Sequence, residues 1–496
     1  MAERRAVTIG QGSYGPPIVV KNDAFRDARF LKKDGTPHMD DVDGRSVERT
    51  ADQTVDEFPG VSGIYERRYA PEGMVTSDAG VISAQEALEQ AQEVPQLVTF
   101  SHNFGDVLPG RPNMDLVPAW SARLKAHLEV ANPFVIAEDI IAGNMGWFAD
   151  ELIASSTERG GNTLLVGPDF YEQLMLVPSE RARELIGRGN PETLDGIIVT
   201  NNVDLLAGRE YHNGIESLAA KAAGRLHLPE STITYDNPWG CAGYVRAKIR
   251  SAEQIQKGLV DVVLNIAADL LSRVADKKHD RDAMLYGDDS GSTVMRALVS
   301  DLPVGILASI SASYAMKYAD ALTMGPSNNK QLQEDFLYLK MDGGKVFKGA
   351  VGYAPSLMIE LLNRAGITPK DVKIFNLHQA NLRILQPVIY AVLKHFEEDV
   401  PPKGDEAAMD AWWRDLSASR IPITIHNRAN TSLGSTAVIN DRVWNKDASL
   451  GTYELRSGDI IDEQSFGAGL GFAGIIERVS EFFPLPKRHV NYDIRF

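Results

Sequence analysis

The sequence of 496 residues contains a single cysteine, Cys241. A disulfide within the chain needs two cysteines, and a cysteine-based zinc site usually draws on several, so a lone thiol argues against both. The side chain is therefore either a small buried hydrophobe, which is a common state of free cysteine, or a nucleophile. The sequence around Cys241 provides the evidence that distinguishes these two interpretations.

Long apolar runs and an excess of positive charge are also lacking. No segment approaches the roughly twenty apolar residues of a membrane span, and the first residues lead into a strand pattern without a signal-peptide core. The 51 basic and 67 acidic residues give a net charge of −16. Nucleic acid and anionic membranes are therefore not expected as general partners, and we expect a cytoplasmic protein.

What the sequence does contain is an alternation of two patterns. Short β-branched runs such as LVTFSHN and GIIVTNN are each followed by helical patterns, AWSARLKAHLEV and SLAAKAAGRLHL. This alternation is typical of an α/β protein with largely parallel sheets. With 44% hydrophobic and 24% charged residues, the chain is long enough for two or three packed units.

Two stretches of the chain read in parallel, 97–167 and 197–267. At an offset of 97 residues, Gly143-Asn144 in the first stretch matches Gly240-Cys241 in the second. The near-constant offset indicates a duplicated β-α-β-α unit whose first copy carries Asn144 in place of the cysteine. The alternative is that any two βα units look alike at this level.

The neighbourhood of Cys241 favours a nucleophile. Asp236-Asn237-Pro238 is a turn signal, and Gly240 and Gly243 permit a sharp bend before YVRAKIRSAEQIQKG, which has helical spacing. Cys241 is thus expected at or near a helix N-terminus. Unpaired N–H groups there stabilise a thiolate, so we expect the thiol pKa to be lowered toward neutral.

Three later segments carry further candidates, although each is common when taken alone. FNLHQANLRIL at 375–385 is a strand that ends at His378, and HNRANTSLGSTAV at 426–438 is a polar loop that opens a helix. In that loop Asn427 is expected to be a helix-cap or loop residue. QSFGAGLGFAGIIERV at 464–479 is a glycine-rich turn after a strand, and it can aim backbone N–H groups at a carbonyl oxygen.

Taken in order, the WGCAG, HQAN, ANTS and FGAG segments resemble the β-ketoacyl-acyl-carrier-protein synthase III family of the thiolase superfamily. Further similar segments lie at 10–23, 63–78, 284–294, 341–351 and 457–472, so the resemblance covers most of 1–95 and 197–479. It implies a thiolase-like five-layered αβαβα fold with two pseudo-symmetric halves. Residues 1–300 would carry the nucleophile, with an inserted or duplicated segment at about 97–195, and residues 301–496 would carry a His/Asn pair.

The resemblance also implies a role for each residue of the site. Cys241 would take an acyl group from a thioester, and His378 and Asn430 would bind the thioester carbonyl of a malonyl-type extender and stabilise its enolate as carbon dioxide leaves. The N–H groups of Cys241 and Ala468 would hold the tetrahedral oxyanion. The substrates would be coenzyme A or phosphopantetheine thioesters, with no metal or redox cofactor.

Binding residues and partners are implied in the same way. Phe58 and Val61 stand where the family commonly has a tryptophan and an arginine around the adenine of coenzyme A, while Arg273 matches a residue near that nucleotide. The lost guanidinium weakens the case for a coenzyme A primer and favours a carrier-protein donor. Lys348 and Arg383 match the family's basic patch for docking acyl carrier protein. Family members pair their central sheets across a two-fold axis, so the resemblance implies a homodimer with active sites near the subunit interface.

Several alternatives stay open at this point. The acyl group could pass to an oxygen, a nitrogen or another carbon without decarboxylation, or the chain could be a degenerate subunit without activity. The carboxamide of Asn144 cannot form a thioester, so the first copy is expected to cover or reshape the acyl entrance. Trp239, which precedes Gly240, is either core packing or a side chain that shortens the acyl pocket.

Overall fold

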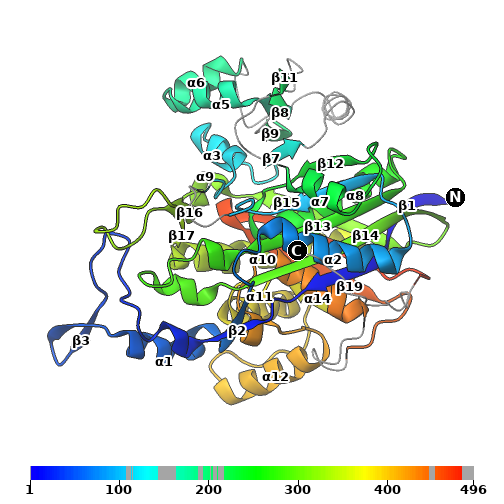
Figure 1. The fold of residues 1–496 in the computed structure, drawn as a ribbon. Coiled ribbons are helices and arrows are strands. Elements are labelled where there is room, and N and C mark those ends of the chain that lie inside the picture. The colour runs from blue at the N-terminus through cyan, green and yellow to red at the C-terminus, as the bar shows by residue number, and fades with distance from the viewer. Residues whose placement is uncertain are drawn as a thin grey trace.

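The computed structural model describes residues 2–107, 113, 115–142, 163–187, 194–200, 203–204, 209–210, 217–445 and 453–482. Two large sheets run through this part of the chain (Figure 1). The first has the order β1 (Glu3–Tyr14), β14 (Asp288–Ser300), β13 (Val262–Leu270), β6 (Leu97–Ser101), β12 (Ile233–Asp236), β7 (Ile136–Ala142), β9 (Gly196–Thr200), β8 (Thr163–Val166). The second has the order β15 (Gly305–Ser313), β20 (Gly471–Arg478), β19 (Ile460–Gly467), β18 (Val372–Leu377).

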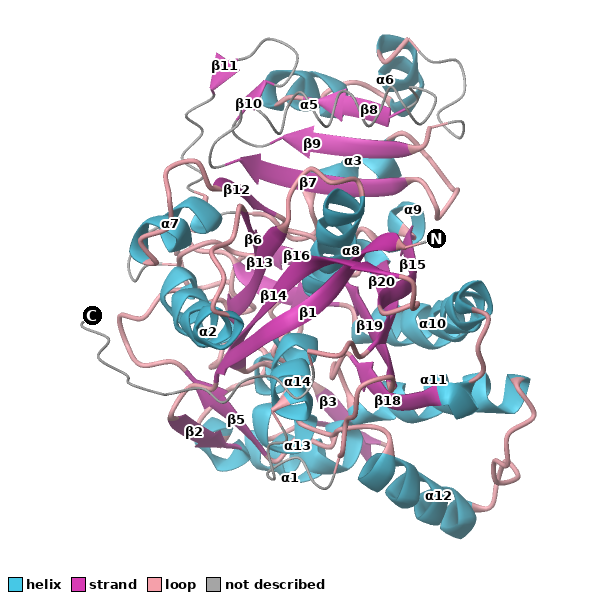
Figure 2. Cartoon of the chain, turned by 90° about the vertical axis from the view of Figure 1, so that its right-hand side faces the viewer, coloured by secondary structure: helices cyan, strands magenta, loops and turns pink. Residues whose placement is uncertain are grey.

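Helices cover both sheets and fill the space between them, which gives the five layers expected of a thiolase-like fold (Figure 2). Helices α2 (Thr76–Ala91) and α7 (Leu218–Arg225) pack on the outer side of the first sheet. Helices α8 (Gly243–Gln256) and α14 (Gly434–Trp444) contact both sheets, and α10 (Gly343–Ala365) packs with α11 (Leu382–His395) on the second. Every residue of β13 is buried, because helices cover both faces of its sheet.

Smaller elements complete the described part of the chain. Three small antiparallel pairs are β2 (Ile18–Lys21) with β5 (Glu66–Tyr69), β3 (Met39–Val42) with β4 (Arg45–Glu48), and β16 (Leu322–Gly325) with β17 (Tyr338–Met341). Short strands β10 (Val203–Asp204) and β11 (Arg209–Glu210) pair with each other. The remaining helices are α1 (Ala51–Ser62), α3 (Trp120–His127), α5 (Pro168–Met175), α6 (Ser179–Leu185), α9 (Ala315–Tyr318), α12 (Glu406–Ser419) and α13 (Ile425–Arg428). Among the described helices, none has the length and hydropathy needed to cross a bilayer.

Strands β7, β9 and β8 extend the first sheet beyond β12, and together with α3, α5 and α6 they form what we call the additional unit (Figure 2). Strands β7 and β8 both pair in parallel with β9, just as β12 and β13 both pair in parallel with β6. The two groups of three strands meet where β7 pairs antiparallel with β12. Six strands of the first sheet therefore form two similar parallel groups joined edge to edge, and β14 and β1 continue the sheet antiparallel beyond β13.

Local structure in the two groups agrees with a duplication. The first two backbone N–H groups of α3 donate to the carboxylate of Asp139 in β7, at 2.7 and 2.8 Å. In the same way, the first two backbone N–H groups of α7 donate to the carboxylate of Asp236 in β12, both at 2.7 Å. After these helices the chain turns through a residue with positive φ, Glu129 at 58° and His227 at 53°. These matching details recur at the offset of 97 to 98 residues found in the sequence.

The central strands of the two copies are exchanged. Strand β6 leads into α3 and β7 but lies between β13 and β12, whereas β9 leads into α7 and β12 but lies between β7 and β8. The additional unit is therefore not the continuous segment 97–195 expected from the sequence, since it excludes β6 and includes β9. Two similar units can exchange a strand because each central strand offers the same parallel edges. Gly143 and Asn144 lie outside the described residues.

Candidate functional site

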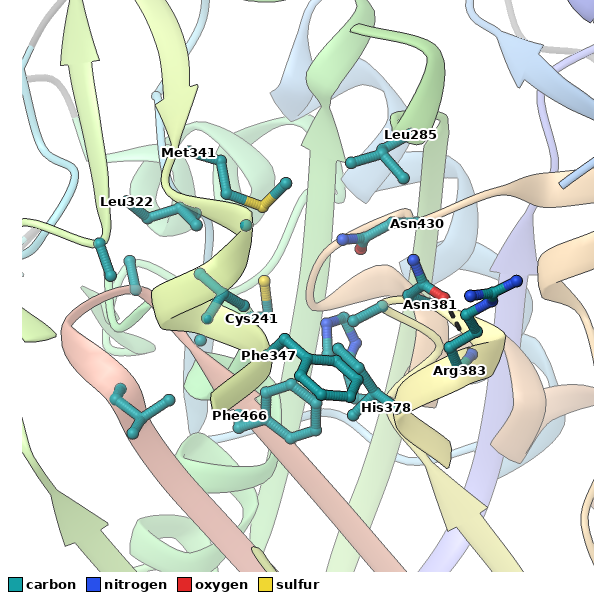
Figure 3. Close-up of a pocket in the computed structure, with 18 of the residues that line it drawn as sticks. Cys241, Leu285, Leu322, Met341, Phe347, His378, Asn381, Arg383, Asn430 and Phe466 are labelled. Carbon is teal, nitrogen blue, oxygen red and sulfur yellow. Dashed lines mark hydrogen bonds between the residues drawn. The ribbon is translucent and has the colours of Figure 1, made fainter. Parts of the chain in front are cut away.

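A cavity of about 610 Å³ lies between the two halves of the chain. Cys241, His378 and Asn430 all line it, and Figure 3 shows their side chains directed toward one another across it. Cys241 lies in the turn Gly240–Ala242 before α8, His378 follows β18, and Asn430 follows α13. The structure thus brings together three predicted residues that are far apart in the sequence.

The turn that carries Cys241 contacts the glycine-rich turn after β19. Gly240 has a φ of +61°, and a Cβ atom there would lie 2.6 Å from the backbone nitrogen of Ala468. A Cβ atom at Gly467 would lie 2.3 Å from the backbone nitrogen of Cys241. Only glycine permits this approach, and it places the amides of Cys241 and Ala468 at the same wall of the cavity. Both residues also line the cavity, and the binding of one oxyanion by their two amides stays a prediction.

Hydrogen bonds to the thiol come from a buried polar network. The Ser432 hydroxyl donates to Cys241 Sγ at 3.3 Å, and the Asn103 Nδ2 group donates to Ser432 Oγ at 2.8 Å. Asn103 Nδ2 also donates to Asp269 Oδ2 at 2.6 Å. Burial raises the pKa of the Asp269 carboxyl to about 6. Ser432 therefore links the thiol to the buried Asn103 and Asp269 pair.

Burial raises the pKa of the Cys241 thiol to about 12, and the Ser432 hydrogen bond only partly opposes this effect. The prediction of a thiol pKa near neutral is wrong for this structure. The helix α8 begins two residues after the cysteine, and burial is the largest influence on the pKa of the thiol. The thiol is protonated at rest, so its proton must leave as it attacks.

The His378 ring is neutral. Burial lowers its pKa to about 3, and 1% of the residue is exposed. Its Nδ1 atom lies 2.7 Å from Ser435 Oγ, and this oxygen accepts the backbone N–H of Gln379 at 3.3 Å. The Ser435 hydrogen can therefore donate to Nδ1, which leaves the ring hydrogen on Nε2. A neutral ring of this tautomer offers one N–H donor beside Cys241.

The Asn430 side chain is oriented by its own loop. Its backbone N–H donates to the Leu285 carbonyl at 2.8 Å, and its Oδ1 atom accepts the Ser432 N–H at 2.9 Å. With the oxygen occupied, the Nδ2 group is the donor directed at the cavity (Figure 3). Asn427 is exposed on α13 and is absent from the lining of this cavity. The structure thus places Asn430 rather than Asn427 in the site.

The predicted coenzyme A residues do not lie together. Phe58 lines a second cavity of about 390 Å³, which shares Val61, Leu285 and Asn381 with the main one. Arg273 lines neither cavity, and its guanidinium donates to the carbonyl oxygens of Ala70, Pro71 and Met74. Its Nη2 group is thus engaged with backbone carbonyls away from both cavities, and a nucleotide role for Arg273 gains no support.

Sequence reasoning missed the cations that do line the second cavity, Arg49 and Arg281. Arg281 is exposed at its wall and belongs to the charged run KKHDRD at 277–282. This charged run is the feature of the sequence that could have identified Arg281 as a candidate binding residue. Arg49 is held by Asp40 and Glu57, so its charge is shared with two carboxylates.

Of the predicted docking residues, Arg383 is exposed at the rim of the main cavity and donates to the Gly60 carbonyl at 2.8 Å. Lys348 is exposed on α10, next to Phe347, which lines the cavity (Figure 3). Both cations thus lie close to the cavity. Trp239 is buried, lines none of the cavities described here, and its Nε1 group donates to the Ala137 carbonyl in β7 at 2.5 Å. It is core packing that fixes the nucleophile turn to the additional unit.

Comparisons with known proteins lead to the family that the sequence motifs resemble. No protein-family model matches the sequence. The chain is 28% identical over 257 residues to β-ketoacyl-[acyl-carrier-protein] synthase III of Caldanaerobacter subterraneus, an alignment that covers 51% of this chain and 68% of that protein. It is 27% identical over 318 residues to the synthase III of Coxiella burnetii, covering 64% and 86%. The crystal structure of synthase III from Thermus thermophilus aligns with 95% of this chain and 98% of its own, with a TM-score of 0.55 and 20% identity. The chain is therefore a thiolase-fold protein that resembles β-ketoacyl-[acyl-carrier-protein] synthase III.

Proposed function

We propose that the chain is an acyl thioester condensing enzyme that forms a 3-oxoacyl product by decarboxylative condensation. The observation that supports this most is the convergence of one thiol and two neutral N–H donors, from His378 and Asn430, on a single cavity. The paired amides of Cys241 and Ala468 add an oxyanion site to the same wall.

In the first half-reaction, the Cys241 sulfur attacks the carbonyl carbon of an acyl thioester. A new S–C bond forms, the bond to the donor sulfur breaks, and the thiol proton leaves with the donor thiol. The amides of Cys241 and Ala468 stabilise the negative oxygen of the tetrahedral intermediate.

In the second half-reaction, a malonyl-type thioester enters the cavity. Its thioester carbonyl accepts hydrogen bonds from His378 Nε2 and Asn430 Nδ2, and the C–C bond to the carboxylate breaks to release carbon dioxide. The electron pair remains as an enolate, which the two neutral donors stabilise. The enolate carbon then attacks the acyl carbon on Cys241, and the cysteine sulfur leaves. A simple transfer to an oxygen or nitrogen acceptor needs no enolate, so two donors favour condensation over that alternative.

These steps need no metal or redox cofactor, and they use thioesters of coenzyme A or phosphopantetheine as substrates. An acyl carrier protein is the proposed extender donor. Arg383 and Lys348 are exposed near the cavity, where they suit an acidic partner.

Charge reversal at Arg383 is expected to raise KM for a carrier-bound extender and to leave KM for a small thioester unchanged.

The variant His378→Ala tests the division into two half-reactions. Intact mass should show Cys241 acylated by an acyl thioester, whereas release of carbon dioxide from the malonyl thioester should fall by about a hundredfold or more, since one of two enolate donors is lost. The unmodified enzyme and Asn427→Ala serve as controls and should perform both steps. If acylation and decarboxylation fall equally in His378→Ala, the proposed role of His378 is refuted. Acyl transfer without any carbon dioxide release by the native enzyme would favour the alternative acyltransferase.

A further inference from the structure

Attack by Cys241 requires a group that takes the thiol proton, and the side chains that line the large cavity are poor acceptors. Burial raises the pKa of the Cys241 thiol to about 12, so the sulfur holds its proton at rest. Burial lowers the pKa of the His378 ring to about 3, which makes it a weak base. Burial also raises the pKa of the Tyr286 hydroxyl well above its usual range, so this group stays protonated. None of the described residues that line this cavity is a carboxylate.

A buried carboxylate lies behind the thiol, at the far end of the network described above. Asn103 Nδ2 contacts Ser432 Oγ at 2.8 Å and Asp269 Oδ2 at 2.6 Å, and Ser432 Oγ lies 3.3 Å from Cys241 Sγ. Burial raises the pKa of the Asp269 carboxyl to about 6, and hydrogen bonding from Ser432 and Asn103 partly opposes this effect. Asp269 is therefore ionised at neutral pH and binds a proton more tightly than the buried histidine ring of the site does.

The Ser432 hydroxyl can serve both the thiol and the carboxylate. A hydroxyl has one hydrogen to donate and two lone pairs that accept. When its hydrogen turns from the sulfur to Asp269, one lone pair keeps the Asn103 contact and the other can accept the thiol hydrogen across the same 3.3 Å. The Ser432 N–H donates to Asn430 Oδ1 at 2.9 Å, and the Asn103 N–H donates to Asp269 Oδ1 at 2.9 Å. These backbone contacts hold the two ends of the path in place.

We propose that Asp269 is the proton acceptor for Cys241 and that the Ser432 hydroxyl relays the proton between them. This inference rests on the acyl transfer of the proposed function. As the sulfur attacks the acyl carbon, the S–H bond breaks, its proton passes to Ser432 Oγ, and the hydroxyl hydrogen passes to Asp269. When the bond to the donor sulfur breaks, a proton passes to that sulfur and the carboxylate is restored. A thiol that is protonated at rest can thus react without a standing thiolate.

Other titratable groups face the same region, and they bear on any pH dependence. His102 Nε2 lies 3.3 Å from Asp236 Oδ2, and its ring also faces Asp269. Asp289 stands opposite Asp269 in the register of β13 and β14 and forms an ion pair with Arg428. Burial raises the pKa of the Asp289 carboxyl to about 6 as well. Substitution of Asp269 itself is therefore needed to assign a pH dependence to it.

The test is the rate at which S-acetyl-pantetheine acylates Cys241, followed by intact mass between about pH 5 and about pH 9. In the native enzyme the rate should rise as the pH passes about 6 and then level off, because the carboxylate is the active form of Asp269. Asp269→Asn should react about a hundredfold more slowly at about pH 8. Its rate should rise about tenfold per pH unit without levelling off, because it follows the thiolate alone.

Asp288→Asn is the matched control for Asp269→Asn. Asp288 is equally buried and accepts the N–H groups of Ala70 and Ser272, both at 2.8 Å, but it lines neither the large cavity nor the second one. This variant should keep the native rate and the native pH profile. A hundredfold loss in Asp288→Asn as well would overturn the specific role of Asp269.

The sign of the change separates a proton acceptor from a nearby charge. Besides burial, the negative charge of Asp269 raises the pKa of Cys241. Removing a carboxylate that acted only as a charge would therefore give a more acidic thiol and faster acylation. Equal or faster acylation in Asp269→Asn overturns this inference and leaves acyl transfer intact. No acylation of the native enzyme, with Cys241 still alkylated by iodoacetamide, overturns the proposed function and this inference with it.

Ser432→Ala keeps the test decisive should Asp269→Asn fail to fold. It interrupts the same path but retains Asp269 and its contacts with Asn103. Its acylation rate should also rise steeply with pH and not level off. Where both variants fold, the double variant should be no slower than the slower single one, because the two groups act in one path. A level profile above about pH 7 in Ser432→Ala overturns the relay.

Discussion

At the scale of single residues, two serines separate the two functions of the site. Ser432 donates to the sulfur of Cys241, whereas Ser435 contacts Nδ1 of His378. A hydrogen bond to a thiolate stabilises the charged form, so Ser432→Ala should raise the thiol pKa further and reduce the thiolate at any given pH. We expect iodoacetamide alkylation of Cys241 to slow by about tenfold near neutral pH and its pH profile to move upward.

Ser435→Ala is the control for this prediction. It should leave the alkylation profile unchanged and reduce carbon dioxide release, because the ring loses the contact that selects its tautomer. An unchanged profile in Ser432→Ala would show that the 3.3 Å contact does not act on the thiolate.

At the scale of elements, β7 is fixed to the helix that follows the nucleophile. Glu138 in β7 is 3% exposed and bonds Arg246 Nε at 2.6 Å and Arg250 Nε at 3.0 Å, both on α8. The two guanidinium groups hold the pKa of the Glu138 carboxyl well below its usual range. Glu138→Gln leaves two largely buried cations without their anion, and it should lower the free energy of unfolding by about 3 kcal/mol. Urea unfolding measures this change.

Glu129→Gln removes the exposed ion pair with Arg183 and should cost less than about 1 kcal/mol. Equal effects of the two substitutions would mean that the Glu138 pair contributes no more than a surface contact.

At the scale of the whole molecule, the additional unit occupies the place where another chain could pair. Strand β12 leads directly to Cys241, so a subunit interface near the active site would continue the sheet at β12. In this chain β7 already pairs with that edge. A homodimer formed by pairing two chains at the edge of β12 is therefore not expected. We expect sedimentation at micromolar concentration to give the mass of one chain, 54.3 kDa. A mass twice as large would show that the chains associate through another surface.

The sequence alone identified the candidate residues of the site, because residue types and their order are local features. Cys241 between glycines, the HQAN, ANTS and FGAG segments and the repeat offset led to Cys241, His378, Asn430 and Ala468, and the structure places all four on one cavity. A cytoplasmic location, the carrier-protein partner and the role of Asn144 stay predictions.

Tertiary structure decided the quantities that depend on neighbours distant in the sequence. Burial raises the thiol pKa, which a helix pattern cannot reveal, and the Nη2 group of Arg273 donates to carbonyls some two hundred residues away. The exchange of β6 and β9 is a choice between equivalent sheet edges, so no strand pattern distinguishes it. Local sequence specifies which groups are present, whereas burial and distance arise only when separate segments pack.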